Sequence, residues 1–490
     1  MITTMEFTDG YKLDHRRQYP NGTEFVYSNW TPRSNAYFPE AEDGCVVFGI
    51  QYFIKEYLIK RFNEDFFNLD EDVAVKTFER RINTFLGENE VGTAHIRDLH
   101  RLGYLPICIK ALPEGDVCPI GVPMLTIINT DPRFFWLTNF LETMMSMCLW
   151  LPMTSATTAR VYRKELERHA TKTMFPKDVE LGFSCHDFSM RGMAGMEAAI
   201  TSGMGHLTSF IGSETIPAIA ACEEYYNANA DTELIAATVP ATEHSVMCAG
   251  GIDDEFGTFK RLLTELYPKG FVSIVSDTWD FWQVITDFIP RLKDDILARD
   301  GRFVVRPDSG IPEDIICGTG NPDDPEYVRK GAYECLWDIF GGTYTENGYK
   351  VLDTHIGMIY GDSITIERQR EIYRRLEEKG FAATNLVLGI GSYTYQYRTR
   401  DSLGFAMKAT WCRINGERKE IFKSPKTDSG MKKSLRGLIS VVKEDGKYVA
   451  YDCAHPSDES NSELKVVFED GKLVKEFSLQ EVRDNVRKTI

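Results

Sequence analysis

One short segment of this 490-residue chain combines a guanidinium, a carboxylate and a tight turn directly after an apolar run. Arg306-Pro307-Asp308-Ser309-Gly310 follows Phe303-Val304-Val305. Arginine presents a planar fork of donors that matches phosphate oxygens, and an aspartate can accept from two adjacent ribose hydroxyls. The pattern therefore indicates a site for an anionic sugar phosphate, with a surface turn closed by a salt bridge as the plainer alternative.

Small residues end two further apolar runs. Gly361-Asp362-Ser363 and Gly389-Ile390-Gly391-Ser392 stand at the ends of expected strands, and a helix pattern follows the first. Backbone amides beside small residues can form an anion cradle, to which Arg400 could add charge. Each segment is a weak signal alone, because glycine at a strand end more often serves a turn and an isolated arginine is more often a surface residue.

Two more segments carry groups suited to ring binding and to nucleophilic or acid–base work. Phe188 stands between His186-Asp187 and Arg191-Gly192, and an aromatic face beside hydrogen-bonding groups suits a flat heteroaromatic substrate. A core phenylalanine beside a structural ion pair would give the same pattern. His244 follows a proline-defined turn in the segment 238–245. A lone histidine is more often structural, but an imidazole can also act as a nucleophile or an acid–base group.

The composition and the missing motifs exclude several classes of protein. The formal net charge of −17 argues against an extended nucleic-acid surface or a basic membrane-binding face. The first residues lack a basic segment followed by an apolar core, and no later run approaches a membrane-spanning length, so we expect a cytoplasmic protein. The eleven cysteines never form Cys-x-x-Cys, which leaves neither a disulfide framework nor a thiolate zinc site and predicts mostly buried thiols. A Walker-type phosphate loop, an H-E-x-x-H pair and a full dinucleotide fingerprint are also missing.

The sequence predicts that βα units position these residues. Between about residues 155 and 400, short apolar runs lead into polar residues and then helix patterns, most clearly at 271–277, 302–310, 355–363 and 385–392. Such runs fit parallel strands covered on both faces, whose carboxyl ends gather active groups. Residues 365–379 form an amphipathic helix pattern that ends at Gly380. Residues 1–145 and 401–490, with hairpin signals at Glu444 and Glu469, are expected to form a flanking α+β domain around an α/β body at 146–400.

Taken together, in order and spacing, these segments closely resemble the nicotinamide-using members of the type II phosphoribosyltransferase family. The resemblance covers essentially the whole chain and rests on the segments 9–15, 18–20, 186–192, 212–215, 239–245, 272–277, 306–310, 361–362, 399–401 and 422–423. It implies an irregular α/β barrel with a flanking mixed α+β domain from the chain ends, and a homodimer with active sites at the subunit interface. It also implies synthesis of nicotinamide mononucleotide and pyrophosphate from nicotinamide and phosphoribosyl pyrophosphate for NAD biosynthesis.

The same resemblance assigns roles to individual residues. The catalytic pair would be His244, phosphorylated during coupled ATP hydrolysis, and Asp277, which would orient it. The nicotinamide ring would lie between Phe188 and a Tyr11 from the partner subunit, and the other residues around the ring would be Arg191, Glu214, Thr238 and Ser273. The phosphoribosyl and phosphate groups would be held by Arg306, Asp308, Gly361, Asp362, Gly391, Ser392 and Arg400, with Arg33 and Lys423 supplied across the interface.

The expected chemistry needs few protein groups. Displacement of pyrophosphate passes through an oxocarbenium-like state, so positioning the ring nitrogen and neutralising the leaving group are the main tasks. The sequence contains no dedicated carboxylate cage, which fits Mg²⁺ held mainly through substrate phosphates, with ATP as a co-substrate.

Three positions depart from the family pattern. Glu214 replaces an aspartate, Thr238 replaces a serine, and Gly391-Ser392-Tyr393 replaces a run of glycines, which places side chains where phosphate approaches bare backbone. Nicotinate phosphoribosyltransferase remains the alternative activity and would be favoured by a cation facing the pyridine substituent. A catalytically silent nucleotide-binding relative is a second alternative, and a barrel glycosidase with paired carboxylates is hard to reconcile with the basic residues at the strand ends.

Overall fold

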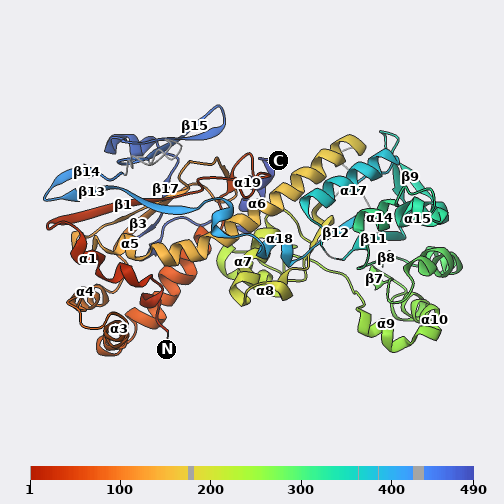
Figure 1. The fold of residues 1–490 in the computed structure, drawn as a ribbon, viewed down its shortest axis with the longest axis horizontal. Coiled ribbons are helices and arrows are strands. Elements are labelled where there is room, and N and C mark those ends of the chain that lie inside the picture. Colours follow the sequence, from red (N-terminus) through yellow and green to blue (C-terminus); the bar gives the residue numbers. More distant parts are fainter. Residues whose placement is uncertain (1, 175–180, 362, 384–385, 423–434) are drawn as a thin grey trace. The chain divides into compact units, whose positions relative to one another are not determined.

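The computed structural model describes residues 2–174, 181–361, 363–383, 386–422 and 435–490, and it contains two compact units (Figure 1). Unit 1 comprises Met1–Thr157, Ala220–Asn229 and Arg398–Thr489, and unit 2 comprises Thr158–Ile219 and Ala230–Tyr397. Among the described residues, no helix is both long enough and apolar enough to cross a membrane.

Unit 2 is built on a parallel sheet of five strands in the order β6-β12-β11-β8-β7. Their bounds are Cys185–Asp187, Leu386–Ile390, Ile356–Tyr360, Phe303–Arg306 and Val272–Val275. Four of them form where the sequence predicted strands, because the apolar runs are buried in the body of the unit. Their carboxyl ends lie at one edge, as parallel pairing requires, and the predicted site residues follow those ends.

Single parallel bridges continue this sheet beyond both edge strands. Asp187 of β6 pairs with Ser213, Gly212 pairs with Ala237, and Ala241 pairs with Ser273 of β7. The segments 212–213 and 237–241 therefore link the two edges, which is the irregular α/β barrel type of arrangement expected from the sequence.

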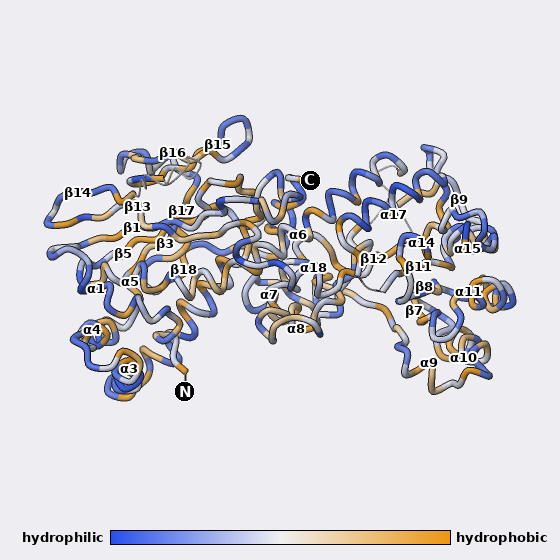
Figure 2. Tube along the Cα trace, viewed as in Figure 1, coloured by the Kyte–Doolittle hydropathy of each residue, from blue (hydrophilic) through white to orange (hydrophobic). Residues whose placement is uncertain are grey.

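Helices cover the sheet, and α17 illustrates why they form. It runs over Ile366–Glu378, with the Thr365 side chain accepting from the Arg368 N–H at its start. Ile366, Ile372, Tyr373 and Leu376 are buried on one face, whereas the tube of α17 is mostly hydrophilic in colour in Figure 2. Gly380 follows with φ +76°, so the predicted helix and its left-handed glycine are confirmed.

The remaining helices of unit 2 connect the strands. They are α7 (Met196–Leu207), α9 (His244–Gly250), α10 (Glu255–Arg261), α11 (Phe281–Gln283), α12 (Ile289–Arg291), α13 (Lys293–Leu297), α14 (Pro312–Cys317), α15 (Glu326–Lys330), α16 (Ala332–Phe340) and α18 (Ser392–Gln396). A small hairpin, β9 (Gly342–Tyr344) with β10 (Lys350–Leu352), lies before β11. The helices α6 (Glu142–Thr173) and α8 (Ile216–Tyr226) each begin in one unit and end in the other.

Unit 1 is organised around a seven-stranded antiparallel sheet in the order β14-β13-β1-β5-β3-β17-β18. The strands are Glu417–Glu420, Ala406–Ile414, Thr23–Thr31, Leu125–Asn129, Ile107–Ala111, Lys465–Glu469 and Lys472–Leu473. Both predicted hairpins are present, β15–β16 (Ser440–Glu444, Lys447–Tyr451) and β17–β18. Their turns place Asp445, Gly446, Asp470 and Gly471 at positive φ, as two-residue hairpin loops require.

Short helices and a two-stranded ribbon complete unit 1. The helices are α1 (His15–Gln18), α2 (Ile50–Phe53), α3 (Glu71–Leu86), α4 (Ala94–Leu102), α5 (Leu137–Phe140) and α19 (Leu479–Arg487), and the ribbon is β2 (Cys45–Val46) with β4 (Val117–Cys118). Nine of the eleven cysteines are buried, and Cys248 and Cys453 are exposed, so the expectation of mostly buried thiols is confirmed.

A buried carboxylate anchors the interior of unit 1. Glu114 accepts hydrogen bonds from the backbone N–H groups of Gly49 and Gln51 and from the Tyr226 hydroxyl, at 3.2, 2.6 and 2.7 Å. Its complete burial nevertheless raises the pKa of the carboxyl group to about 7. The start of α2 is therefore held by a group that can titrate near neutral pH.

Candidate active site

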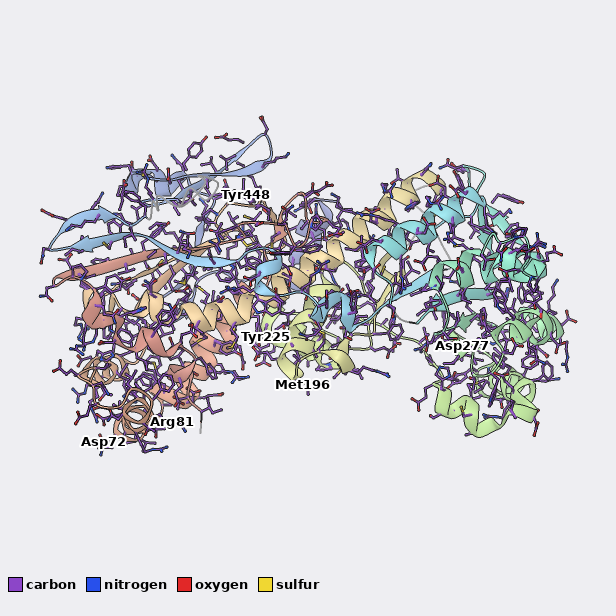
Figure 3. The ribbon with its side chains drawn as sticks, in the orientation of Figure 1. Asp72, Arg81, Met196, Tyr225, Asp277 and Tyr448 are labelled. Carbon is purple, nitrogen blue, oxygen red and sulfur yellow. The ribbon has the colours of Figure 1, made fainter. Side chains whose placement is uncertain are left out.

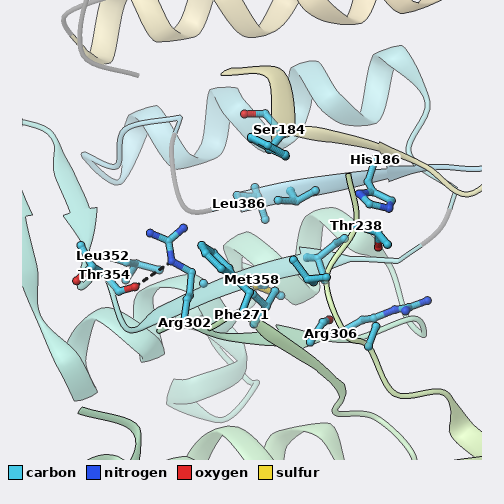
Figure 4. A pocket seen from close by; sticks show the side chains of 18 of the residues that line it. Ser184, His186, Thr238, Phe271, Arg302, Arg306, Leu352, Thr354, Met358 and Leu386 are labelled. Atoms are coloured by element: carbon cyan, nitrogen blue, oxygen red, sulfur yellow. Dashed lines mark hydrogen bonds between the residues drawn. The ribbon is translucent and has the colours of Figure 1, made fainter. Parts of the chain in front are cut away.

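A cavity of about 820 Å³ runs through unit 2 beside the parallel sheet (Figure 4). Arg306 lines it from the carboxyl end of β8 and Ser273 from within β7, whereas Arg302 and Asp353 line it before strands β8 and β11 begin. Its wall is largely apolar, with a few polar groups placed among the hydrophobic ones. Such a cavity suits a small aromatic ligand held in one orientation.

At one end of the cavity, His186 and Thr238 hold the Glu214 carboxylate. His186 Nε2 lies 3.0 Å from Glu214 Oε1, and the Thr238 hydroxyl donates to the same oxygen. The hydrogen bond from His186 is the main cause of the lowered pKa of Glu214. Because both bonds use Oε1, Oε2 of the ionised carboxylate is left to accept from another group.

The local fold explains why these groups meet. His186 and Phe188 share one side of the chain because side chains alternate along β6, and their ring centroids lie 4.6 Å apart. Between them, Asp187 is fully buried and accepts from the Thr215 hydroxyl at 2.7 Å, which anchors the segment that carries Glu214. Gly212 is required for this packing, because a Cβ atom there would lie 2.8 Å from His186 Nδ1.

Arg306 and Ser273 complete the polar part of this end. The Arg306 guanidinium lies over the Phe188 ring, 5.0 Å from its centroid. The Ser273 hydroxyl and Arg306 Nε are buried and have no hydrogen-bond partner among the described residues. Buried polar atoms are rarely left without a partner, so these two are candidate ligand contacts.

The turn after β8 packs against the end of β7. Oδ2 of Asp277 accepts from the N–H groups of Asp308 and Ser309 at 2.8 and 2.7 Å and from the Ser309 hydroxyl at 2.6 Å. Asp277 is labelled in Figure 3. Burial raises the pKa of the Asp308 carboxyl group, although the neighbouring Arg306 acts in the opposite direction.

His244 faces both of these aspartates. Its Nε2 lies 3.9 Å from Asp277 Oδ1 and 4.0 Å from Asp308 Oδ2, which is ion-pair distance but too long for a hydrogen bond. The side chain is half exposed, at 50% of its full accessibility. The imidazole thus combines an accessible ring with two carboxylates on one side.

Two glycines allow the strand ends to approach this turn. A Cβ atom on Gly361 would lie 1.6 Å from Asp308 Oδ1, and one on Gly389 would lie 2.6 Å from the Gly361 carbonyl oxygen. Both positions therefore need glycine for close packing. Asp362, which the sequence placed in the same cradle, lies outside the described residues.

The side chains in the segment 391–393, where the family pattern has a run of glycines, point in different directions. The Ser392 side chain points to Gly192, where a Cβ atom would lie 2.1 Å from the Ser392 hydroxyl oxygen. Tyr393 is exposed and stacks on Tyr397, with ring centroids 4.7 Å apart. Gly391 precedes α18 and has an extended backbone. Because Ser392 contacts Gly192, it lies beside the turn that carries the exposed Arg191.

The other predicted site residues lie in unit 1. Arg33 is fixed to the turn after Arg400, because its Nε donates to the Gly404 carbonyl oxygen at 2.9 Å and its N–H to that of Leu403 at 3.0 Å. Arg400 pairs with its neighbour Asp401. Tyr11 is 64% exposed. Lys423 lies outside the described residues.

Sequence reasoning did not assign a role in the site to His186 or Ser309. His186 could have been found, because it stands two residues before Phe188 and must share its face on a strand. Ser309 carries no such signal, since its partner Asp277 is distant in sequence and meets it only through the pairing of β7 with β8.

Comparisons with known proteins give the family. Residues 183–472 match the nicotinate phosphoribosyltransferase (NAPRTase) family, and residues 4–109 match the nicotinamide phosphoribosyltransferase N-terminal domain. A nicotinamide phosphoribosyltransferase of Acinetobacter baylyi is 49% identical over 99% of this chain and 97% of its own length. One from Mycoplasma pneumoniae is 35% identical over 88% of this chain and 93% of its own length.

Solved structures share the fold at low sequence identity. A nicotinate-nucleotide pyrophosphorylase from Pyrococcus furiosus has a TM-score of 0.58 at 16% identity, covering 99% of this chain and 95% of that one. Human nicotinic acid phosphoribosyltransferase has a TM-score of 0.53 at 16% identity, covering 98% and 93%. With relatives matched over nearly the full length and both the N-terminal and the central family regions present, the chain belongs to the nicotinamide phosphoribosyltransferases, a family of pentosyltransferases within the type II phosphoribosyltransferases.

Proposed function

We propose that this chain transfers the phosphoribosyl group of phosphoribosyl pyrophosphate to nicotinamide, forming nicotinamide mononucleotide and pyrophosphate for NAD biosynthesis in the cytoplasm. The names of its relatives support the reaction. The observation that favours nicotinamide as the base is the Glu214 carboxylate, which His186 and Thr238 hold at one end of the cavity with one oxygen unused.

Base selection follows from the charge of Glu214. Its free Oε2 would accept an N–H of the nicotinamide carboxamide, and the Ser273 hydroxyl would donate to the carboxamide oxygen. Nicotinate would instead bring a carboxylate against a carboxylate whose pKa is lowered and which therefore stays ionised. The Phe188 ring would hold the flat face of the pyridine.

The phosphoribosyl group would lie at the turn after β8. Arg306 would bind phosphate oxygens and Asp308 the ribose hydroxyls, with Gly361 leaving room for the Asp308 carboxylate. The backbone at Gly391 and Ser392, together with Arg400, would receive the 5′-phosphate, and Arg191 would lie beside the pyridine ring. The pyridine nitrogen attacks the anomeric carbon as the bond to pyrophosphate breaks, so the ring nitrogen needs no general base.

Magnesium fits this arrangement as a substrate-bound ion. Among the described residues no group of three or more His, Cys, Asp or Glu side chains could hold a metal ion. The ion would be held mainly through phosphate oxygens of the substrates and through water. When bound, the ion would neutralise charge on the departing pyrophosphate.

ATP would act through His244. The Nδ1 lone pair would attack the γ-phosphorus of ATP, the bond to the β–γ bridging oxygen would break, and ADP would leave. The ring would keep its proton on Nε2, where Asp277 and Asp308 offset the positive charge of the phosphorylated imidazole. ATP hydrolysis would thereby improve substrate binding without entering the bond exchange itself.

A homodimer is the proposed working form. By the family resemblance, Tyr11, Arg33 and Lys423 would enter the active site of the opposite subunit, and the high exposure of Tyr11 supports a contact with a second subunit.

Product identification tests the function. The protein is incubated with phosphoribosyl pyrophosphate, Mg²⁺ and either nicotinamide or nicotinate, with and without ATP, and the nucleotide product is identified. Nicotinamide mononucleotide formed in clear preference supports the proposal. A preference for nicotinate would support the second candidate, nicotinate phosphoribosyltransferase, which the match of residues 183–472 keeps open. No product from either base would indicate a catalytically silent relative.

A further inference from the structure

The carboxylate of Asp277 is bound asymmetrically. Its Oδ2 accepts three hydrogen bonds, two from backbone N–H groups of the turn after β8 and one from the Ser309 hydroxyl, all between 2.6 and 2.8 Å. Its Oδ1 is buried and has no hydrogen-bond partner among the described residues. The aspartate is nearly inaccessible, with 3% of its side chain exposed.

The unused oxygen is the one that faces His244. Asp277 Oδ1 lies 3.9 Å from His244 Nε2, and Asp308 Oδ2 lies 4.0 Å from the same nitrogen. Asp308 belongs to the turn that Oδ2 of Asp277 holds. The imidazole therefore faces two carboxylates, and the carboxylate of Asp277 is hydrogen-bonded to the backbone N–H of Asp308.

The turn is restrained from its other side as well. The Tyr360 hydroxyl donates to the Gly310 carbonyl oxygen at 3.1 Å, and the position of Gly361 leaves no space for even one additional carbon beside Asp308 Oδ1. The turn is therefore held by Asp277 on one side and by Tyr360 on the other, with the Asp308 carboxylate packed closely against Gly361. A displacement of the Asp277 carboxylate would act on the backbone of Asp308.

We propose that Ser309 is a positioning residue that couples the phosphorylation state of His244 to Asp308 through Asp277. The inference deepens the proposed function and rests on its ATP-dependent part. Any residue at position 309 would supply the backbone N–H, but only a hydroxyl side chain adds the third donor to Oδ2.

The third bond has a specific consequence. Three donors saturate Oδ2 and fix the rotation of the carboxylate, so that Oδ1 keeps facing His244. A phosphoryl group on the imidazole changes the charge that both carboxylates experience, and the fixed carboxylate passes the response to the turn that binds the ribose. Without the hydroxyl, two backbone donors remain on Oδ2, the carboxylate is held less firmly, and the response of Asp308 weakens.

The experiment compares Ser309→Ala with Ser309→Thr in the full-length protein. KM for phosphoribosyl pyrophosphate and kcat are measured with and without ATP, and the acid-labile phosphate on the chain is measured with labelled ATP. Ser309 is exposed, so threonine has room for its methyl group and restores the hydroxyl. For Ser309→Ala, we expect the ATP-dependent decrease in KM to shrink about tenfold, the loss of one hydrogen bond to a charged group, while His244 is still phosphorylated. Ser309→Thr should keep the wild-type response.

Two further variants separate this role from general support of the turn. Tyr360→Phe removes a different hydrogen bond to the same turn without touching Asp277, and it should keep the ATP response. Ser309→Cys keeps the size of the side chain with a weaker donor and should behave like Ser309→Ala, which guards against a folding defect of one variant. A wild-type ATP response in Ser309→Ala and Ser309→Cys, or an equal loss in Tyr360→Phe, would overturn the inference. If wild-type protein shows no ATP response at all, the proposed ATP coupling fails and the inference fails with it.

Discussion

His186 Nε2 lies 3.0 Å from Glu214 Oε1, and this hydrogen bond decides which oxygen of the carboxylate can face a substrate. The Thr238 hydroxyl reinforces the arrangement by donating to the same oxygen. A glutamate at position 214 is longer than the aspartate of the family pattern, and the two donors compensate by fixing its extra rotatable bond. Selectivity for the base should depend on Glu214, His186 and Thr238 together.

Removing the charge of Glu214 should reduce the preference for nicotinamide over nicotinate. In Glu214→Gln, we expect the ratio of kcat/KM for nicotinamide to that for nicotinate to fall by roughly a hundredfold, because like-charge repulsion against nicotinate disappears. As matched controls, His186→Gln keeps a side-chain donor and should retain most of the preference, whereas His186→Ala should lose part of it. Equal efficiencies for both bases in the wild-type protein would contradict the assignment.

A methyl group at position 361 should damage phosphoribosyl binding. The added Cβ atom in Gly361→Ala would lie 1.6 Å from Asp308 Oδ1, so the carboxylate or the strand end must move. We expect KM for phosphoribosyl pyrophosphate to rise about tenfold or more, with a smaller change in KM for nicotinamide. Steady-state kinetics with each substrate varied measures both effects, and an unchanged KM for phosphoribosyl pyrophosphate would show that Asp308 does not bind it.

Loss of the imidazole should uncouple ATP from the transferase. His244→Ala should lack ATPase activity and ATP stimulation but keep a weak transferase activity that depends steeply on phosphoribosyl pyrophosphate, because the pyridine nitrogen needs no base. Kinetics with and without ATP and labelling with γ-³²P-ATP measure this. Full ATP stimulation in the variant, or no acid-labile label on wild-type protein, would return His244 to a structural role.

Mixing two inactive variants should restore activity if active sites are shared between subunits. A heterodimer of Tyr11→Ala and Arg306→Ala subunits would have one site with both changes and one with neither. Random reassociation of equal amounts should therefore recover about a quarter of the wild-type sites. Each variant denatured and renatured alone is the control, and no recovery in demonstrated heterodimers would count against sharing.

The buried Glu114 should make folding stability depend on pH. Its pKa is raised from 4.5 to about 7 by burial, so the folded protein binds this proton more tightly than the unfolded chain does. The corresponding stability is fully present below pH 4.5 and is lost as the pH rises to about 7, by about 3 kcal/mol. Glu114→Gln cannot titrate, so the free energy of unfolding of the variant relative to wild type should rise by that amount between pH 4.5 and 7.5, as measured by urea unfolding. A constant difference across this range would mean that the carboxylate is ionised throughout.

Much of the fold could be predicted from local patterns in the sequence. Apolar runs such as Phe303-Val304-Val305 became strands, and the Asp-Gly pairs at 445–446 and 470–471 became hairpin turns, because strand formation and turn geometry depend largely on neighbouring residues. The polar residues at the strand ends gathered at one edge for the same reason, since parallel strands share a carboxyl-terminal edge. The sequence by itself therefore determined the βα character of unit 2, the turn after β8 and the family.

Only the tertiary structure decided which side chains meet. The bonds from His186 to Glu214 and from Ser309 to Asp277 join residues 28 and 32 positions apart, and they depend on strand order and register, which spacing along the chain does not encode. The orientation of the Ser392 side chain was also decided by the tertiary structure. The sequence placed its side chain in the expected phosphate cradle, and the structure shows it pointing to Gly192, where the missing Cβ atom leaves space for the hydroxyl group.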